Sequence, residues 1–292
     1  MKKLTKNQIQ LILIILCTIA FLGCAIWLVL YMKGSSATTK QTESLMDSYV
    51  IVEQLPADPE QSEEDKPYVE VTPIPLEKEK VVIDGKEYDT FEALTVPKRT
   101  IDFEAIQTNE NADIYAWIYI PGTNVDYPVL QHASNDTFYL DHDLQGKKAA
   151  CGSIYTEKAN SKDFNDNHTV LYGHNMKNGT MFKTLHYYDD KEFFQENKYI
   201  YVYTEKDTRV YQIFGAYEYD DRHLLKNFAT ENAGEYQKSL ESIKKLSDAC
   251  GHFDRDMSLN SSDKIITLST CIANKPESRY LVQAKLIAVE AN

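Results

Sequence analysis

The residues that decide the fold are 264–271, which read KIITLSTC. Their β-branched and apolar side chains predict a β-strand that ends at Cys271. A strand end is a rigid support that opens into a loop, so it suits a thiol that has to meet a substrate. Cys271 is therefore a candidate nucleophile, with a buried and inert cysteine as the alternative.

Similar apolar and aromatic runs, bounded by turn residues, recur along residues 98–292. They predict strands at Ile114–Ile120, Gly152–Thr156, Thr169–Tyr172, Tyr199–Tyr203, Val210–Tyr219 and Tyr280–Val289. We therefore expect one domain of mostly antiparallel β structure with a few helices.

Two helices are expected in this domain. One lies near Asp102–Asn109. The other opens at Asn232, has Glu235 placed for a capping box, and ends before Gly251. Cys250 continues its apolar face, so we expect that cysteine to be buried in the core.

The N-terminal part of the chain carries an uncharged apolar segment of 22 residues, 11–32. At about 1.5 Å per residue, a helix of this length crosses a hydrocarbon core of roughly 30 Å. Lys2, Lys3 and Lys6 precede it. The positive-inside rule therefore predicts a single-pass anchor, with residues 1–10 in the cytoplasm and the rest outside the cell.

Two other interpretations of this segment were weighed. A cleaved signal peptide normally has an apolar region of about 7–15 residues, which is shorter than this one. Residues 21–24 resemble a lipoprotein cleavage box, but the apolar run continues through residues 25–30, where a lipoprotein normally turns polar. An uncleaved anchor is the preferred interpretation.

Residues 33–97 form an acidic, proline-containing linker. From residue 34 onward it holds 15 acidic residues, 5 lysines and 6 of the chain's 9 prolines. Such a composition offers little apolar surface to offset chain entropy, so we expect an extended or disordered spacer. Only residues 81–86 suggest order, as a short hairpin.

Over the whole chain, 43% of the residues are hydrophobic and the formal net charge is −13. The composition allows a sizeable core. The negative charge argues against sequence-independent binding to DNA or RNA.

His174 and Arg279 are the candidate partners of Cys271. His174 follows the predicted strand Thr169–Tyr172, so it lies at the edge of the sheet. Arg279 opens the final strand, eight residues after Cys271, where it is either a solvated arginine or a group that stabilises negative charge on a substrate oxygen. The other histidines, expected to be solvated or locally hydrogen-bonded, are His132, His142, His168, His186, His223 and His252.

No cofactor or metal site is predicted. The histidines lack the i, i+4 spacing of a helical zinc site, and the chain has no C-x-x-C motif. Residues 141–146 begin like an EF-hand loop, but Gly152 occupies the position that needs a glutamate. Nucleotide-binding glycine patterns are also absent from the sequence.

Taken in order, these motifs resemble those of class B sortases. TLSTC at 267–271 with Arg279 downstream resembles the TLxTC motif and its arginine. LYGHNM at 171–176, continued by GTMF at 179–182, is similar to the histidine segment of that class. Further similar stretches are WIYIPGT at 117–123, DYPV at 126–129, YL at 139–140 and GSIY at 152–155. The resemblance covers nearly all of residues 98–292.

The resemblance implies a closed eight-stranded sortase-type β-barrel with a few peripheral helices, preceded by one transmembrane helix and an extended linker. It also implies a membrane-anchored cysteine transpeptidase on the outer face of a Gram-positive cell, with a catalytic domain at 98–292. Its partners would be surface proteins with an NPxTN-like or NPxTG-like C-terminal sorting signal, and an amine of a peptidoglycan precursor.

By the same resemblance, Cys271 cleaves the signal after Thr and forms a thioester, which the cell-wall amine resolves. His174 would act as general acid and then as general base, and Arg279 would hold the substrate and its oxyanion. The residues that match substrate-groove positions are Asn135, Leu140, Ser269 and Thr270.

Two features depart from the family pattern. Ile272 and Ala273 follow the cysteine where class B members often carry an acidic residue, and the loop before Arg279 is shorter than in some relatives. Both features border the groove, so they bear on signal preference. The alternatives are a pilin-polymerising sortase that uses a pilin lysine, and a non-catalytic surface binding module on an acidic stalk.

Overall fold

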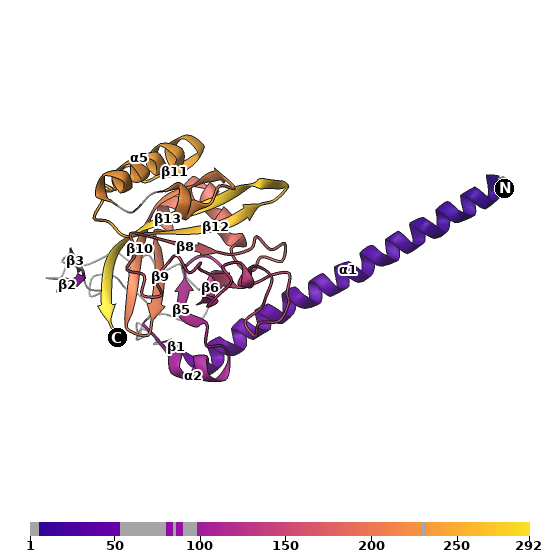
Figure 1. The fold of residues 1–292 in the computed structure, drawn as a ribbon, viewed down its shortest axis with the longest axis horizontal. Coiled ribbons are helices and arrows are strands. Elements are labelled where there is room, and N and C mark those ends of the chain that lie inside the picture. Colours follow the sequence, from indigo (N-terminus) through magenta and orange to yellow (C-terminus); the bar gives the residue numbers. More distant parts are fainter. Residues whose placement is uncertain (1–5, 53–79, 84–85, 90–97, 229, 231) are drawn as a thin grey trace, which may run out of the picture.

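The computed structural model describes residues 6–52, 80–83, 86–89, 98–228, 230 and 232–292 (Figure 1). The predicted closed barrel is confirmed. Within the described residues, eight strands form a ring in the order β10-β9-β5-β6-β7-β8-β12-β13, and β13 pairs back onto β10 to close it. They are β5 (Ile114–Tyr119), β6 (Asp126–Leu130), β7 (Ile154–Tyr155), β8 (His168–Tyr172), β9 (Tyr199–Thr204), β10 (Asp207–Asp220), β12 (Ile265–Ile272) and β13 (Lys275–Ala291).

Shorter strands and helices lie around the ring. The remaining strands are β1 (Val50–Val52), β2 (Lys80–Ile83), β3 (Lys86–Asp89), β4 (Arg99–Ile101) and β11 (Gly251–Phe253). The helices are α1 (Lys6–Tyr49), α2 (Phe103–Asn109), α3 (Lys191–Glu196), α4 (Leu224–Asn227) and α5 (Ala233–Cys250), with 3₁₀ helices η2 (Phe138–Leu140) and η3 (Lys183–Asp189). The hairpin predicted at 81–86 is present as β2 and β3.

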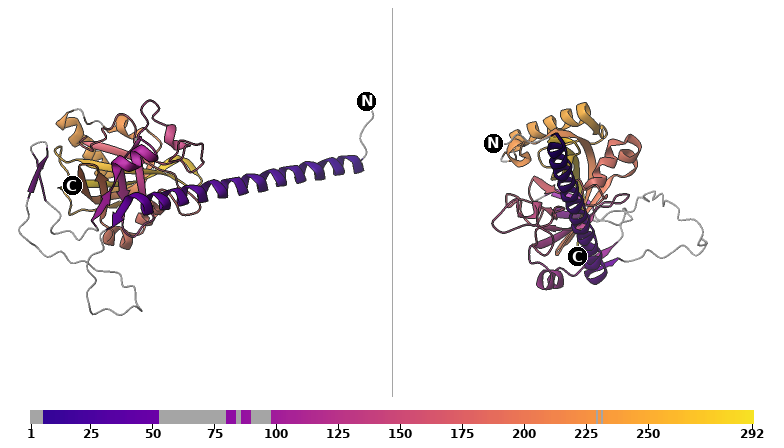
Figure 2. Two further views of the ribbon diagram at one scale, coloured as in Figure 1. Left: turned by 90° about the horizontal axis from the view of Figure 1, so that it is seen from below. Right: turned by 90° about the vertical axis from the view of Figure 1, so that its right-hand side faces the viewer.

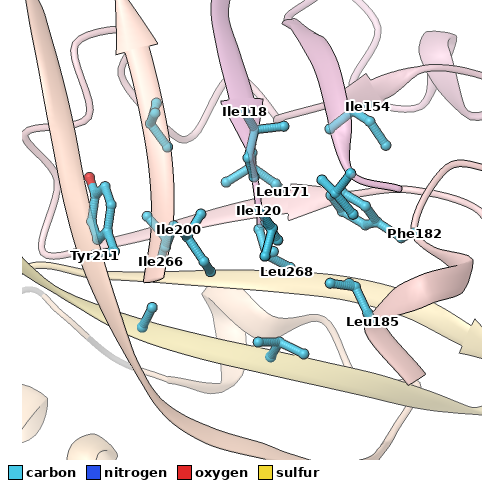
Figure 3. Packing of buried hydrophobic residues seen from close by; sticks show 14 of the residues in the cluster. Ile118, Ile120, Ile154, Leu171, Phe182, Leu185, Ile200, Tyr211, Ile266 and Leu268 are labelled. Carbon is cyan, nitrogen blue, oxygen red and sulfur yellow. The ribbon is translucent and has the colours of Figure 1, made fainter. Parts of the chain in front are cut away.

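The alternation of β12 explains both the core and the site. Ile266 and Leu268 are fully buried in the cluster that fills the barrel (Figure 3). Ile265 belongs instead to the cluster that packs under α5. Because side chains alternate along a strand, Thr267, Ser269 and Cys271 point to the same outer face as Ile265.

The seven predicted strands are confirmed with boundary changes of a few residues, and β6 is an additional strand. Pro128 lies in β6, and a proline normally argues against a strand inside a sheet. The structure accommodates it because β7 begins its pairing with β6 only at Val129.

The two predicted helices are also confirmed. Asn232 caps α5 by accepting a hydrogen bond of 2.9 Å from the backbone N–H of Glu235. The expectation for Cys250 was wrong, because its side chain is exposed. The buried face of α5 passes through Ser247, whose hydroxyl donates to the His252 carbonyl oxygen, rather than through Cys250.

The first part of the predicted linker is not extended, which corrects that prediction. Helix α1 continues to Tyr49 and extends from the barrel as a rod (Figure 2). Near its end Leu45 is buried against the domain, and the Gln41 amide donates to an oxygen of Asp143 at 3.4 Å. Strand β1 then pairs with β4. These tertiary contacts order residues whose composition suggested a spacer; residues 53–79, 84–85 and 90–97 lie outside the described part.

Within the described part of the chain, none of the helices combines the length and apolar character needed to cross a membrane. The anchor at residues 11–32 stays a prediction from the sequence.

Candidate functional site

The register between β8 and β12 brings the candidate histidine and cysteine to one edge. These strands are parallel, and Tyr172 pairs with Ser269. His174 lies two residues beyond the end of β8, and Cys271 lies two residues after Ser269 in β12. The N–H of Gly173 donates to the Ser269 carbonyl oxygen at 3.1 Å, which keeps the two chains together at this point.

Gly173 is required immediately before His174. A Cβ atom there would lie 2.5 Å from Ile154 Cδ1 and 2.7 Å from Phe182 Cδ2, closer than packed atoms can approach. The backbone that carries His174 is therefore pressed directly onto the core of the barrel.

Arg279 lies directly across the antiparallel β12–β13 ladder from Cys271. The connecting hairpin is short because Ile272 already pairs with Lys275, and Asn274 adopts a left-handed φ of 62°. Nη1 of Arg279 donates to the carbonyl oxygens of Pro276 and Ser278, at 2.8 and 3.0 Å. The guanidinium is thus oriented beside the cysteine by its own hairpin.

The imidazole of His174 is held from the opposite side by η2. Its Nε2 lies 2.7 Å from the carbonyl oxygen of Leu140. A carbonyl only accepts hydrogen bonds, so Nε2 carries the proton in this arrangement. Gly152, with φ of 54°, allows the backbone of Leu140 to pack closely, because a Cβ there would be 2.5 Å from the same oxygen.

The predicted groove residues divide into two groups. Leu140 is 45% exposed, and Asn135 is exposed with its side-chain oxygen accepting from the Thr137 backbone and hydroxyl. Ser269 and Thr270 are buried. Ser269 shares the outer face of Cys271, whereas Thr270 alternates toward the barrel interior.

Aromatic and charged groups line the wall next to the cysteine. The rings of Tyr155 and Tyr172 stack with centroids 5.4 Å apart. Burial raises the pKa of Tyr155, and the charges of Glu157 and Cys271 add to the effect. Burial also raises the pKa of Glu157, against the opposing effect of His223, whose Nε2 lies 2.9 Å from the carboxylate.

Two residues at the site were missed from the sequence. Asn175 and His186 both contact the carbonyl oxygen of Cys271, although His186 was expected to be solvated or locally hydrogen-bonded. A composition or spacing signal could not have found them, because each reaches a backbone atom distant in sequence. Among the described residues, no group of three or more His, Cys, Asp or Glu side chains is placed to hold a metal ion.

Comparison with known proteins gives consistent matches. A family model described as a sortase domain matches residues 118–287, which include Cys271, His174 and Arg279. Sortase B of Listeria monocytogenes is 32% identical over 179 residues, covering 61% of this chain and 71% of the relative.

Solved structures are similar as well. The X-ray structure of Clostridium perfringens sortase B is 35% identical with a TM-score of 0.57, covering 63% of this chain and 99% of that chain. A Staphylococcus aureus sortase B–substrate complex is 31% identical with a TM-score of 0.57, covering 64% and 84% of the two chains.

Proposed function

Because this chain belongs to the sortase family as a class B cysteine transpeptidase, we propose that it cleaves a C-terminal sorting signal after Thr and transfers the protein to a cell-wall amine. The signal is NPxTN-like or NPxTG-like, and Cys271 carries the intermediate. The observation that carries this proposal is the convergence of Cys271, His174 and Arg279 at one edge of the barrel.

In the first half of the reaction, the pair reacts as a Cys271 thiolate and a His174 imidazolium, and Sγ of Cys271 attacks the carbonyl carbon of the signal's Thr. The C–N bond breaks, a thioester forms, and His174 gives its Nε2 proton to the leaving amine. Its hydrogen bond to the Leu140 carbonyl keeps that proton on Nε2 until the substrate arrives.

In the second half, an amine of a cell-wall precursor attacks the thioester. His174 takes a proton from the amine, an amide forms, and the Cys271 thiolate leaves. Nη1 of Arg279 is used by its hairpin, which leaves Nε and Nη2 to donate to a substrate carbonyl and to the developing oxyanion.

We further propose that residues 11–32 anchor the enzyme in the cell membrane of a Gram-positive organism, with the catalytic domain outside. The uncharged apolar segment and the lysines before it support this. The solvent-exposed side chains Ile15, Leu16, Ile19, Phe21, Leu22 and Ile26 of α1 are consistent with contact to lipid.

A peptide assay tests the proposed chemistry. The full chain in detergent is incubated with fluorescent NPxTN-like and NPxTG-like peptides, with and without an added amine, beside the Cys271→Ala variant. We expect cleavage after Thr that requires Cys271 and an amide product with the amine. If no signal is turned over and Cys271 resists thiol reagents, the binding-module alternative is favoured instead.

A further inference from the structure

The backbone carbonyl of the nucleophile is held by two side chains from other parts of the chain. Nδ2 of Asn175 donates to the Cys271 carbonyl oxygen at 2.8 Å, and Nε2 of His186 lies 3.1 Å from the same oxygen. Asn175 follows His174 directly, and His186 belongs to η3. Three segments therefore meet at one peptide group.

This carbonyl lies where the β-sheet stops being regular. The β12–β13 register shifts between Cys271 and Ile272, at the start of the tight hairpin. A shift of this kind disrupts the ladder hydrogen bonds, so backbone groups there need partners outside the sheet. Asn175 and His186 supply two such partners.

The ring of His186 is itself fixed. It packs on Tyr280 with ring centroids 4.8 Å apart, and Tyr280 is buried in β13 opposite Thr270. Nε2 of His186 also lies 3.0 Å from Nδ2 of Asn175, so it donates to the Cys271 carbonyl when protonated and accepts from the Asn175 amide when unprotonated. Burial lowers the pKa of His186, against the opposing effect of the bond to Cys271.

Asn175 is next to His174 in the chain, so its hydrogen bond to Cys271 links the histidine segment to the nucleophile. One amide group ties the peptide of the nucleophile to the residue after the general acid. We propose that Asn175 and His186 are positioning residues that fix the peptide of Cys271 and set the separation between its thiol and the His174 imidazole. This rests on the roles proposed above for Cys271 and His174. A misplacement of about 1 Å in such a pair costs roughly a hundredfold in rate.

Two substitutions of His186 separate its hydrogen bonding from its ring packing, and a third substitution tests Asn175. His186→Phe keeps an aromatic ring against Tyr280 but removes the nitrogen that contacts Asn175 and the Cys271 carbonyl, whereas His186→Gln keeps a side chain that can donate or accept. Asn175→Asp is nearly isosteric and replaces the donor with a carboxylate.

His252 offers a matched control. Its Nε2 lies 2.9 Å from the carbonyl oxygen of Asp189, the last residue of η3, and its ring packs on Phe194 at 5.5 Å. His252→Phe therefore removes the same kind of bond without touching Cys271.

The test measures kcat and KM with the cleaved signal peptide, the alkylation rates of individual cysteines by mass spectrometry, and the melting temperature. The exposed Cys250 is an internal control for alkylation. For His186→Phe and Asn175→Asp we expect kcat to fall about 10- to 100-fold with KM within about twofold. Alkylation of Cys271, but not of Cys250, should slow. His186→Gln should recover most of kcat, and His252→Phe should keep it.

Two results would overturn the proposal. One is a kcat for His186→Phe within twofold of the unmodified chain. The other is a loss that tracks melting temperature in the same way for His186→Phe and His252→Phe. If no signal is turned over at all, the proposed function fails, and the alkylation rate of Cys271 against Cys250 decides on positioning by itself.

Discussion

Two very different pairs, each with one histidine, lie along or just beyond strands β8 and β12. In the buried pair, on the outer face of the barrel, Nε2 of His168 lies 2.7 Å from the hydroxyl of Thr267. Near the C-terminal ends of the strands lie Cys271, which is exposed, and His174, which bonds to the Leu140 carbonyl oxygen.

The buried pair belongs to a hydrogen-bond network, although Nδ1 of His168 has no hydrogen-bond partner among the described residues. Gln283 donates to the Thr267 hydroxyl at 2.8 Å and accepts from the Tyr217 hydroxyl at 3.0 Å. Burial lowers the pKa of His168 to about 4. The difference teaches that a histidine beside a hydroxyl or thiol is structural when both are buried and bonded, and reactive where strands end and the partners remain accessible.

Replacing each of the two histidines with glutamine should give the largest difference in kcat between the two pairs. His174→Gln removes the acid and base and should lower kcat by about 10²–10⁴-fold. His168→Gln should retain kcat per folded molecule, because the buried pair of His168 and Thr267 takes no part in the reaction. Peptide turnover normalised to the folded fraction measures both; equal losses would erase the distinction between the pairs.

Arg279 lies across from the exposed Cys271, and its replacement should have the next largest effect on kcat/KM. Arg279→Lys keeps the charge but loses the planar fork of donors, so kcat/KM should fall by roughly 10²-fold. Arg222→Lys is the control, because Arg222 is exposed and pairs with Asp220. The idea fails if Arg279→Lys retains more than half of the kcat/KM of the unmodified chain.

The buried pair of His168 and Thr267 should instead affect how the free energy of unfolding depends on pH. The unfolded chain binds a proton on His168 near pH 6.5, whereas burial lowers the folded pKa to about 4. The stability that the neutral histidine contributes is therefore fully present above pH 6.5 and is lost as the pH falls toward 4. The loss is on the order of 3 kcal/mol.

Chemical denaturation at several pH values measures this loss. His168→Gln should flatten the curve between pH 6.5 and 4. Parallel curves for the unmodified chain and His168→Gln would contradict the assignment.

Local signals were enough to predict much of the fold. Alternating apolar residues predict the strand that ends at Cys271, and Asn232 with Glu235 predicts the start of α5. Pro128 concealed β6, because a proline is normally excluded from an interior strand. The docked end of α1 was missed because Leu45 is ordered by tertiary packing that an acidic composition does not reveal.

The residues of the site also fall into those that the sequence predicts and those that it does not. Cys271 and His174 lie near the C-terminal ends of β12 and β8, as the sequence predicts, whereas Arg279 lies inside β13, which begins at Lys275, and pairs with Cys271. Asn175 and His186 reach the Cys271 carbonyl from 96 and 85 residues away, and contacts to a backbone atom leave no pattern in side-chain sequence. His168 was expected to be solvated or locally bonded, yet its partner Thr267 is 99 residues away.

Trapping of the acyl-enzyme tests the central claim most directly. The full chain is mixed with a sorting-signal peptide without an added amine, and its intact mass is measured beside that of Cys271→Ala. The account predicts a hydroxylamine-sensitive adduct on Cys271 that consists of the peptide up to its Thr. An unmodified chain, or an adduct that persists in Cys271→Ala, would contradict it.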